Sequence, residues 1–158
     1  KEHSMTYFNK NSELQRGYNS YIDESTNPMG TMMNVGLLVM EDGDTYTYEN
    51  AAHEVAMLLF EGKVTFAYAG RTVEADRPDC FHHEAYCLLA PRNTKITLTA
   101  HGHAEIYMQD TENERGYEPV MYTPETVQTQ YGGVFLPLRL SPRLRCRLCQ
   151  RRCIQNGA

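Results

Sequence analysis

The feature that most constrains this chain is a series of short apolar or alternating segments, separated by turn sequences at regular intervals. The turn sequences are EDGD, EGK, AGR, DRPD, PRN and HGH. The segments between them span residues 35–40, 45–49, 54–60, 63–69, 71–75, 86–90, 95–100 and 104–110. Many short strands with a turn about every 8–12 residues are typical of antiparallel sandwiches and barrels. We therefore predict an all-β fold, a jelly-roll barrel of antiparallel strands with little helix.

Two assignments within this series depend on local detail. Residues 54–60, EVAMLLF, fit a helix or a strand by periodicity alone. Their length, and the EGK sequence that follows as a turn, favour a strand separate from the one at residues 63–69. Aromatic residues alternate with small or polar ones at Tyr46, Tyr48, Phe66 and Tyr68, so we interpret these four as core and face packing.

Charge divides the chain into two unlike parts. Residues 1–133 carry 9 basic and 20 acidic side chains, whereas residues 134–158 carry six arginines and no acid. An acidic body is a poor candidate for binding nucleic acid. We expect a partly ordered lead-in at residues 1–30, a barrel at 31–122, a linker at 123–133 and an Arg/Cys-rich tail at 134–158.

The tail contains three closely spaced cysteines, Cys146, Cys149 and Cys153. A structural zinc site needs four ligands, and the tail offers no fourth cysteine or histidine. We interpret the tail as the product of translation in a shifted reading frame, in preference to a genuine fusion. A nucleic-acid-binding arm is the remaining alternative, because arginines contact phosphates, but the tail lacks the aromatic interleaving of single-strand binders.

The cellular compartment is inferred from the cysteines and the apolar runs. The chain has five cysteines, an odd number, and its first ten residues, KEHSMTYFNK, lack the apolar stretch of a signal peptide. The longest apolar runs, 35–40 and 55–60, fall far short of the roughly 20 residues that cross a bilayer. We expect a cytoplasmic protein with reduced thiols and no membrane association.

Residues 43–62, GDTYTYENAAHEVAMLLFEG, resemble the first motif of the cupin superfamily, in which two glycines bracket three metal ligands. Residues 91–96 resemble the second motif, which carries a fourth ligand. Matching Gly43 and Gly62 to the bracketing glycines puts four residues at the ligand positions: Glu49, Ala51, Val55 and Ile96. A divalent ion needs several converging lone-pair donors, which these residues do not supply. We expect an apolar, filled interior without a metal or other cofactor.

Longer stretches, residues 34–66 and 77–100, resemble the N-terminal half of the bicupin uronate isomerases, the family of 5-deoxy-glucuronate isomerase from inositol catabolism. The resemblance covers residues 30–130. It implies a divalent metal held by a second, His-rich cupin, which has no counterpart in this chain. It therefore assigns no catalytic residue here, and it implies a truncated, non-catalytic half. Because such a half leaves the face meant for its partner uncovered, we expect self-association.

Two histidine clusters remain to be interpreted. His82, His83 and Glu84 follow the DRPD turn, and we take them as weak candidates for binding a uronate-type small molecule. Polar residues at the barrel rim are the favoured alternative, because adjacent side chains on a strand diverge. His101 and His103 flank Gly102 in a tight turn, where we expect them to face water.

Three functions therefore remain open. The first is the sugar-acid isomerase implied by the resemblance, and the second is a non-catalytic sugar-acid-binding or assembly module. The third is nucleic-acid binding through the tail.

Overall fold

The computed structural model describes residues 13–26 and 30–127. All the regular secondary structure within them is β-strand. The strands are β1 (Gly17–Ile22), β2 (Asn34–Met40), β3 (Thr45–Tyr48), β4 (His53–Tyr68), β5 (Arg71–Arg77), β6 (Tyr86–Ala90), β7 (Ile96–Ala100), β8 (Ala104–Glu112) and β9 (Val120–Tyr122). The predicted all-β fold is confirmed. In these residues no helix is long and apolar enough to cross a bilayer.

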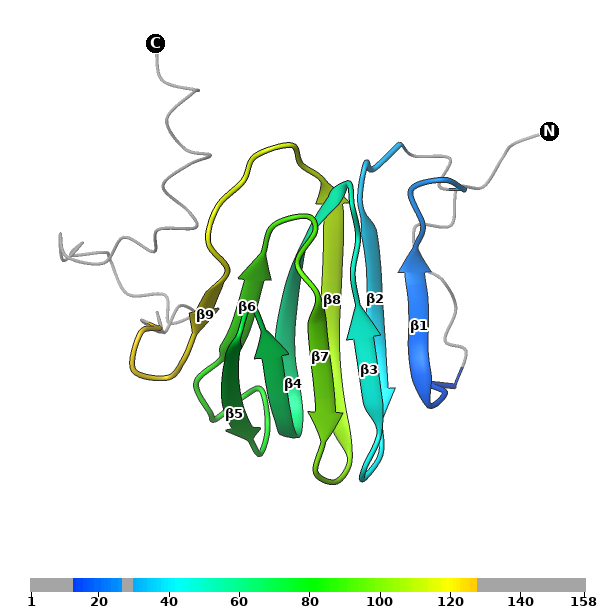
Figure 1. Cartoon of the computed structure of the whole chain (residues 1–158). Helices are drawn as coiled ribbons and strands as arrows, with labels where there is room; N and C mark the ends of the chain where they lie inside the picture. The colour runs from blue at the N-terminus through cyan, green and yellow to red at the C-terminus, as the bar shows by residue number, and fades with distance from the viewer. Residues whose placement is uncertain (1–12, 27–29, 128–158) are drawn as a thin grey trace, which may run out of the picture.

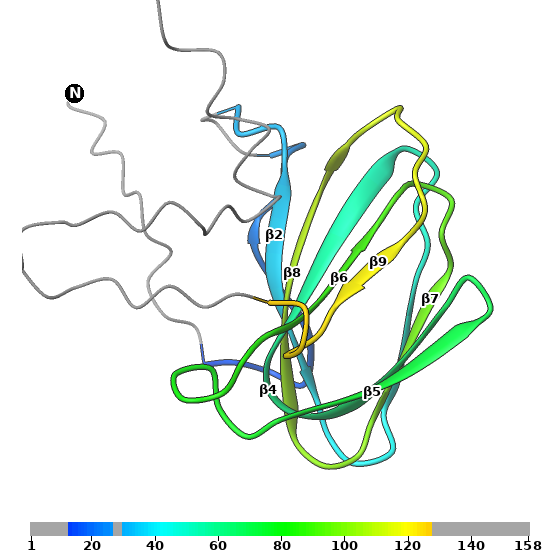
Figure 2. The ribbon, with the colours of Figure 1, turned by 90° about the vertical axis from the view of Figure 1, so that its left-hand side faces the viewer.

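The strands form two antiparallel layers that face each other, as Figures 1 and 2 show from two sides. Sheet A has the order β1-β2-β8-β4-β6-β9. Sheet B has the order β3-β7-β4-β5. Strand β4 belongs to both, which joins the layers into one barrel-like sandwich.

The prediction of a turn at EGK, residues 61–63, is wrong, because β4 continues through these residues without interruption. The first part of β4 pairs with β8 and β6 in sheet A, and the second part pairs with β5 and β7 in sheet B. The register shifts between Leu59 and Glu61, and Gly62 takes a φ of 102°. A β-bulge bends a strand and increases its twist, which allows β4 to pass from one sheet to the other.

The predicted lead-in also needs correction, because β1 lies inside it. Strand β1 pairs with β2 along residues 17–22, so sheet A begins before residue 31. The last described strand, β9, ends at Tyr122. The arginines and cysteines of the tail lie outside the described residues.

The core lies between the two sheets and is built from the inward side of each strand. Phe66 is the largest fully buried side chain, and residues from both layers surround it. Complete burial of an aliphatic or aromatic side chain contributes about 1.5–3 kcal/mol. The core includes Leu38, Met40, Met57, Leu59, Val64, Leu88, Leu98, Ile106 and Met108.

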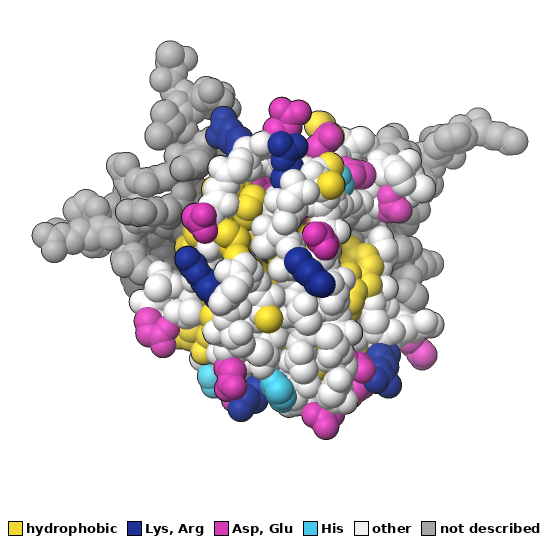
Figure 3. All heavy atoms as spheres, in the orientation of Figure 1, with side chains coloured by type: hydrophobic (Ala, Val, Ile, Leu, Met, Phe, Trp, Pro, Cys, Tyr) yellow, Lys and Arg dark blue, Asp and Glu magenta, His cyan; other side chains and the backbone are white. Residues whose placement is uncertain are grey.

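The outward sides of the two sheets differ in chemistry. Across sheet B the paired positions are Thr47, Thr97, Ala67 and Thr72 in one row, and Thr45, Thr99, Thr65 and Glu74 in the next. Figure 3 shows this side as mostly non-hydrophobic, with scattered charges. Across sheet A the corresponding rows are Leu37, Tyr107, Leu58 and Cys87, then Val35, Gln109, Ala56 and Leu89. An antiparallel sheet that faces water usually alternates apolar and polar residues, as sheet B does and sheet A does not.

Candidate functional site

The turns of the two cupin-like motifs survive, although the ligand positions carry other residues. Gly43 takes a φ of 78°, and Asn93 takes a φ of 62° at the place where the second motif has glycine. Asparagine is among the residues that tolerate this left-handed conformation. Val55 and Ile96 are buried in the core, as expected. Neither side chain has a lone pair for a metal ion, so these positions do not fit the metal site of a cupin.

The other two matched positions are not in the barrel interior. Glu49 and Ala51 lie in the segment between β3 and β4 and are exposed. The side chains that β3 turns toward the core are Tyr46 and Tyr48. The prediction that Glu49 and Ala51 stand in ligand positions is therefore wrong, because β3 ends at Tyr48.

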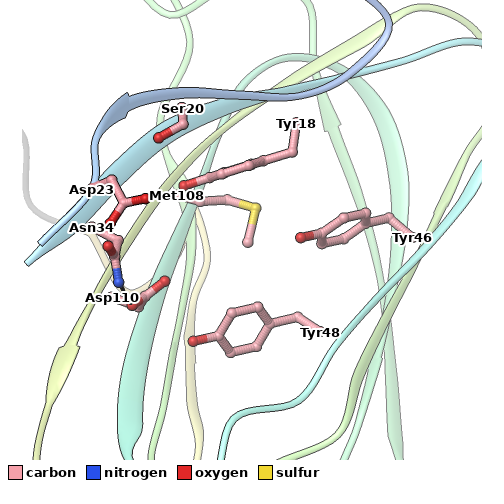
Figure 4. Close-up of a pocket in the computed structure, with 8 residues that line it drawn as sticks. All are labelled: Tyr18, Ser20, Asp23, Asn34, Tyr46, Tyr48, Met108 and Asp110. Carbon is pink, nitrogen blue, oxygen red and sulfur yellow. Dashed lines mark hydrogen bonds between the residues drawn. The ribbon is translucent and has the colours of Figure 1, made fainter. Parts of the chain in front are cut away.

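A cavity of about 280 Å³ opens between β3 and the three sheet A strands β1, β2 and β8. We call it the barrel-mouth cavity. Polar groups contribute to its lining together with Met108 and the tyrosine rings, so the expectation of a wholly apolar and filled interior is wrong at this end of the barrel. Figure 4 shows the lining residues, Tyr18, Ser20, Asp23, Asn34, Tyr46, Tyr48, Met108 and Asp110.

A hydrogen-bonded network includes two residues of this lining, Asn34 and Asp110. His53 Nδ1 lies 2.5 Å from an oxygen of Asp110, and its Nε2 lies 3.0 Å from an oxygen of Glu24. Asn34 donates its side-chain amide to Asp110 at 2.8 Å and accepts the backbone N–H of Glu24 at 2.9 Å. The two nitrogens of this one ring therefore contact two different carboxylate side chains, and the imidazole bridges them.

Three phenol groups also line this cavity, beside Ser20 and Asp23. The hydroxyl of Tyr48 is buried and has no hydrogen-bond partner among the described residues. An unsatisfied buried polar group costs about 1–3 kcal/mol, which is a reason to expect a partner from solution. Burial, and then the charge of Asp110, raises the pKa of Tyr18 to about 12 and also raises the pKa values of Tyr46 and Tyr48. All three phenols therefore stay protonated and can both donate and accept.

The sequence-predicted residues His82, His83 and Glu84 line a second, smaller cavity of about 140 Å³. These residues lie in a turn, as the DRPD sequence suggested. The carboxylate of Asp79 is the common hydrogen-bond partner of the polar groups in this loop. It accepts the backbone N–H groups of Phe81 and His82, and it lies about 3 Å from the Nδ1 atoms of both histidines. These contacts, the backbone N–H of His82 first, hold the pKa of Asp79 well below its usual range.

A buried arginine also belongs to this smaller cavity. The guanidinium of Arg77 donates to the carbonyl oxygens of Leu59, Cys80 and His83. These bonds fasten the loop of residues 78–85 to β4 and engage Nε and both terminal nitrogens. These hydrogen bonds stabilise the loop that lines the smaller cavity. Substrate binding by His82, His83 and Glu84 stays a prediction.

The HGH turn was expected to leave two histidines facing water. Both are exposed, as expected, and each also has a side-chain partner: His101 Nε2 lies 2.7 Å from the hydroxyl of Thr65, and His103 Nδ1 lies 2.9 Å from Glu41. Ligand atoms of Glu61, His103 and Glu105 lie within 4.8 Å of one another. The hydrogen bond that His103 donates to Glu41, and then the charges of the carboxylates, raise the pKa of His103. The group lies apart from the barrel-mouth cavity, and its contacts are those of an ion-pair cluster.

The two-layered barrel and the retained motif turns define a cupin-type protein. The particular family is identified by a family model, that of the KduI/IolB family, which matches residues 7–136. This chain belongs to that family, and the predicted resemblance is confirmed. The family match agrees with the observed barrel, but by itself it names no functional residue.

Three solved structures are similar to this chain, and the first of them shows the same fold. An IolB-like protein from Salmonella typhimurium aligns with a TM-score of 0.69 at 17% identity, over 77% of this chain and 47% of the Salmonella chain. A cupin superfamily protein from Desulfitobacterium hafniense aligns at 0.49 and 10% identity, over 65% and 84% of the two chains. The Cnp3 cupin domain of Schizosaccharomyces pombe aligns at 0.48 and 12% identity, over 61% and 64%. This chain spans about half the length of the IolB-like protein. No curated protein sequence matches it significantly.

Proposed function

We propose that this chain is the first, non-catalytic barrel of a two-barrel sugar-acid isomerase that acts on 5-deoxy-glucuronate. Membership of the KduI/IolB family supports the sugar-acid chemistry. Exchange between an aldose and a ketose needs a base that moves a proton and an acid, often a metal ion, that polarises the carbonyl. Val55 and Ile96 leave the cupin ligand positions of this barrel without donors. The metal and the chemistry therefore belong to the second barrel in this proposal.

The observation that carries the proposal is the apolar outer face of sheet A. Leu58, Cys87, Leu89 and Tyr107 lie on it and are only partly buried, and Phe60 stacks on Tyr107 with 5.7 Å between ring centroids. An apolar face of this kind marks an interaction surface. The chain spans 47% of the IolB-like protein, which leaves a length similar to a second barrel. We propose that the second barrel packs on this face, and that the chain alone pairs with itself there.

Sedimentation of the purified chain over a range of concentrations tests this surface. The double variant Leu58→Thr/Leu89→Thr gives sheet A the threonine chemistry of sheet B without lowering strand propensity. We expect the unchanged chain to associate as its concentration rises and the double variant to stay monomeric. Thr97→Val, on the outer side of sheet B, is the matched control and should associate like the unchanged chain. A monomer at every concentration, or association that survives the double substitution, would contradict the proposal.

A direct assay tests the catalytic half of the proposal. The full chain, supplied with zinc or manganese, should not convert 5-deoxy-glucuronate at a rate above the uncatalysed reaction. Turnover that persists after repurification and disappears on substitution of residues in this chain would show that the barrel is itself an isomerase.

A further inference from the structure

The barrel-mouth cavity has the construction of a small binding site. Its walls come from the consecutive strands β1, β2 and β3 and from the distant strand β8, and a hydrogen-bonded network holds the lining residues Asn34 and Asp110 in place. Its volume of about 280 Å³ is close to the lower end, about 300 Å³, of the range for small-molecule sites. That volume suits a ligand of one ring rather than an oligomer.

The polar groups on the two sides of the cavity are complementary to hydroxyl groups. In Figure 4 the phenols of Tyr46 and Tyr48 point across the cavity toward the side that carries Asp110. Among residues 13–26 and 30–127 the buried Tyr48 hydroxyl has no partner at hydrogen-bond distance, and Asp110 is the acidic group that acts on it. A ligand hydroxyl can accept from a phenol and donate to a carboxylate, so it satisfies both sides at once.

The charges of the cavity disfavour an acidic ligand. Asp23 and Asp110 are in the lining, which contains no lysine or arginine. Glu24 stands behind them, and the imidazole of His53 is already engaged by Glu24 and Asp110. A carboxylate placed here would face like charges without an uncompensated cation, which is unfavourable in a partly desolvated site.

We infer that the barrel-mouth cavity binds one ring of a neutral, polyhydroxylated molecule, such as a neutral sugar, and discriminates against the corresponding sugar acid. The site would hold its ligand by hydrogen bonds from Tyr46 and Tyr48 and to Asp110. It is separate from the 5-deoxy-glucuronate chemistry proposed for the second barrel, and it does not depend on the packing of that barrel.

Matched pairs of ligands test this inference on the full chain. D-glucose, D-galactose and D-mannose differ from their uronates only at the terminal carbon, where a hydroxymethyl group replaces a carboxylate. Their binding can be followed by isothermal titration and by the fluorescence of the tyrosines, since the chain has no tryptophan. We expect at least one neutral sugar to bind about tenfold more tightly than its uronate, because of the two lining carboxylates.

Two variants locate the site. Tyr48→Phe removes only the hydroxyl that lacks a partner, so the fold should be retained and the affinity for the neutral sugar should fall about tenfold. Tyr107→Phe, on the outer face of sheet A, is the matched control and should leave affinity unchanged. Asp23→Asn removes one lining carboxylate outside the His53 network. It should reduce the ratio of the affinity for the neutral sugar to the affinity for its uronate several-fold.

Several results would overturn the inference. These are equal or tighter binding of the uronates, unchanged affinity in a folded Tyr48→Phe variant, and the absence of binding by all three neutral sugars. Binding of ammonium or divalent cations without any binding of sugars would also contradict the inference, because the ligand of the cavity would then be a cation and not a hydroxyl-rich molecule.

Discussion

His53 and Asp110 are partners across neighbouring strands, with His53 Nδ1 only 2.5 Å from a carboxylate oxygen of Asp110. Both side chains are largely buried, at 13% and 12% exposure. The same imidazole reaches Glu24, in the segment after β1. One ring therefore ties β4 to β8 and to the N-terminal edge of sheet A.

Replacing this ring tests its contribution to stability. We expect His53→Ala to lower the free energy of unfolding by about 2–3 kcal/mol, because Asp110 keeps its charge and loses its closest partner. Urea denaturation measures the loss. In a double-mutant cycle with Asp110→Asn, the combined variant should lose less than the sum of the single losses, and simple additivity would show that the two groups do not interact. His101→Ala, at an exposed position, should change stability by no more than about 0.5 kcal/mol.

Gly62 supports the bend of β4 through its lack of a side chain. A Cβ added there would lie 2.3 Å from the carbonyl oxygen of His103 and 2.7 Å from the Cα of Ala104, and the φ of 102° is itself strained for other residues. We expect Gly62→Ala to destabilise the fold by at least about 2 kcal/mol. Gly102→Ala is the control, because its φ is also positive but a Cβ there meets nothing within 4 Å. Equal losses in the two variants, measured by chemical denaturation, would show that contact with β8 is unimportant.

His103 should make stability depend on pH. Its pKa is raised in the folded state above the ordinary value of 6.5, by Glu41 first and then by Glu105 and Glu61. A raised pKa means that the folded protein binds the proton more tightly than the unfolded chain. The stabilisation is therefore fully present below 6.5 and is lost as the pH rises through the higher folded value.

The comparison of unchanged protein with His103→Gln isolates this effect. At acidic pH the unchanged protein should have a higher free energy of unfolding than His103→Gln, by no more than about 1 kcal/mol because these groups are half-exposed. The difference between the two proteins should shrink in alkaline solution. Thermal melts at a series of pH values measure the difference. A gap that widens as the pH rises would contradict the assigned partners of His103.

The turn and strand pattern of the sequence predicted most of the sheet. Alternation placed β3, β7 and β8 close to their observed positions, since residues two apart share a face, and the apolar runs between turn sequences placed β2 and β6. Two local assignments failed for physical reasons. EGK was taken for a turn, but a glycine with positive φ serves a turn and a β-bulge equally well. The strand β1, GYNSYI, has mostly polar or exposed residues because it is an edge strand, so its pattern lacks a buried side.

The candidate site was harder to predict than the fold. His82, His83 and Glu84 were selected as a cluster in sequence, and in the structure the two histidines contact Asp79 while Arg77 binds the carbonyl oxygen of His83, which stabilises the loop. The tyrosines of β3 were interpreted as core packing. They do face the interior, but they also line the barrel-mouth cavity.

The amino-acid sequence alone determined which side of the alternating strands, such as β7 and β8, faces the core, and it determined that the cupin ligand positions Val55 and Ile96 carry no donor. Both properties are local, because they depend on residue type and on a period of two. Only the tertiary structure decided that Tyr48 and Asp110, from strands 62 positions apart in the chain, share a cavity. Such a meeting depends on the pairing of distant strands and on the bend of β4, which no local pattern specifies.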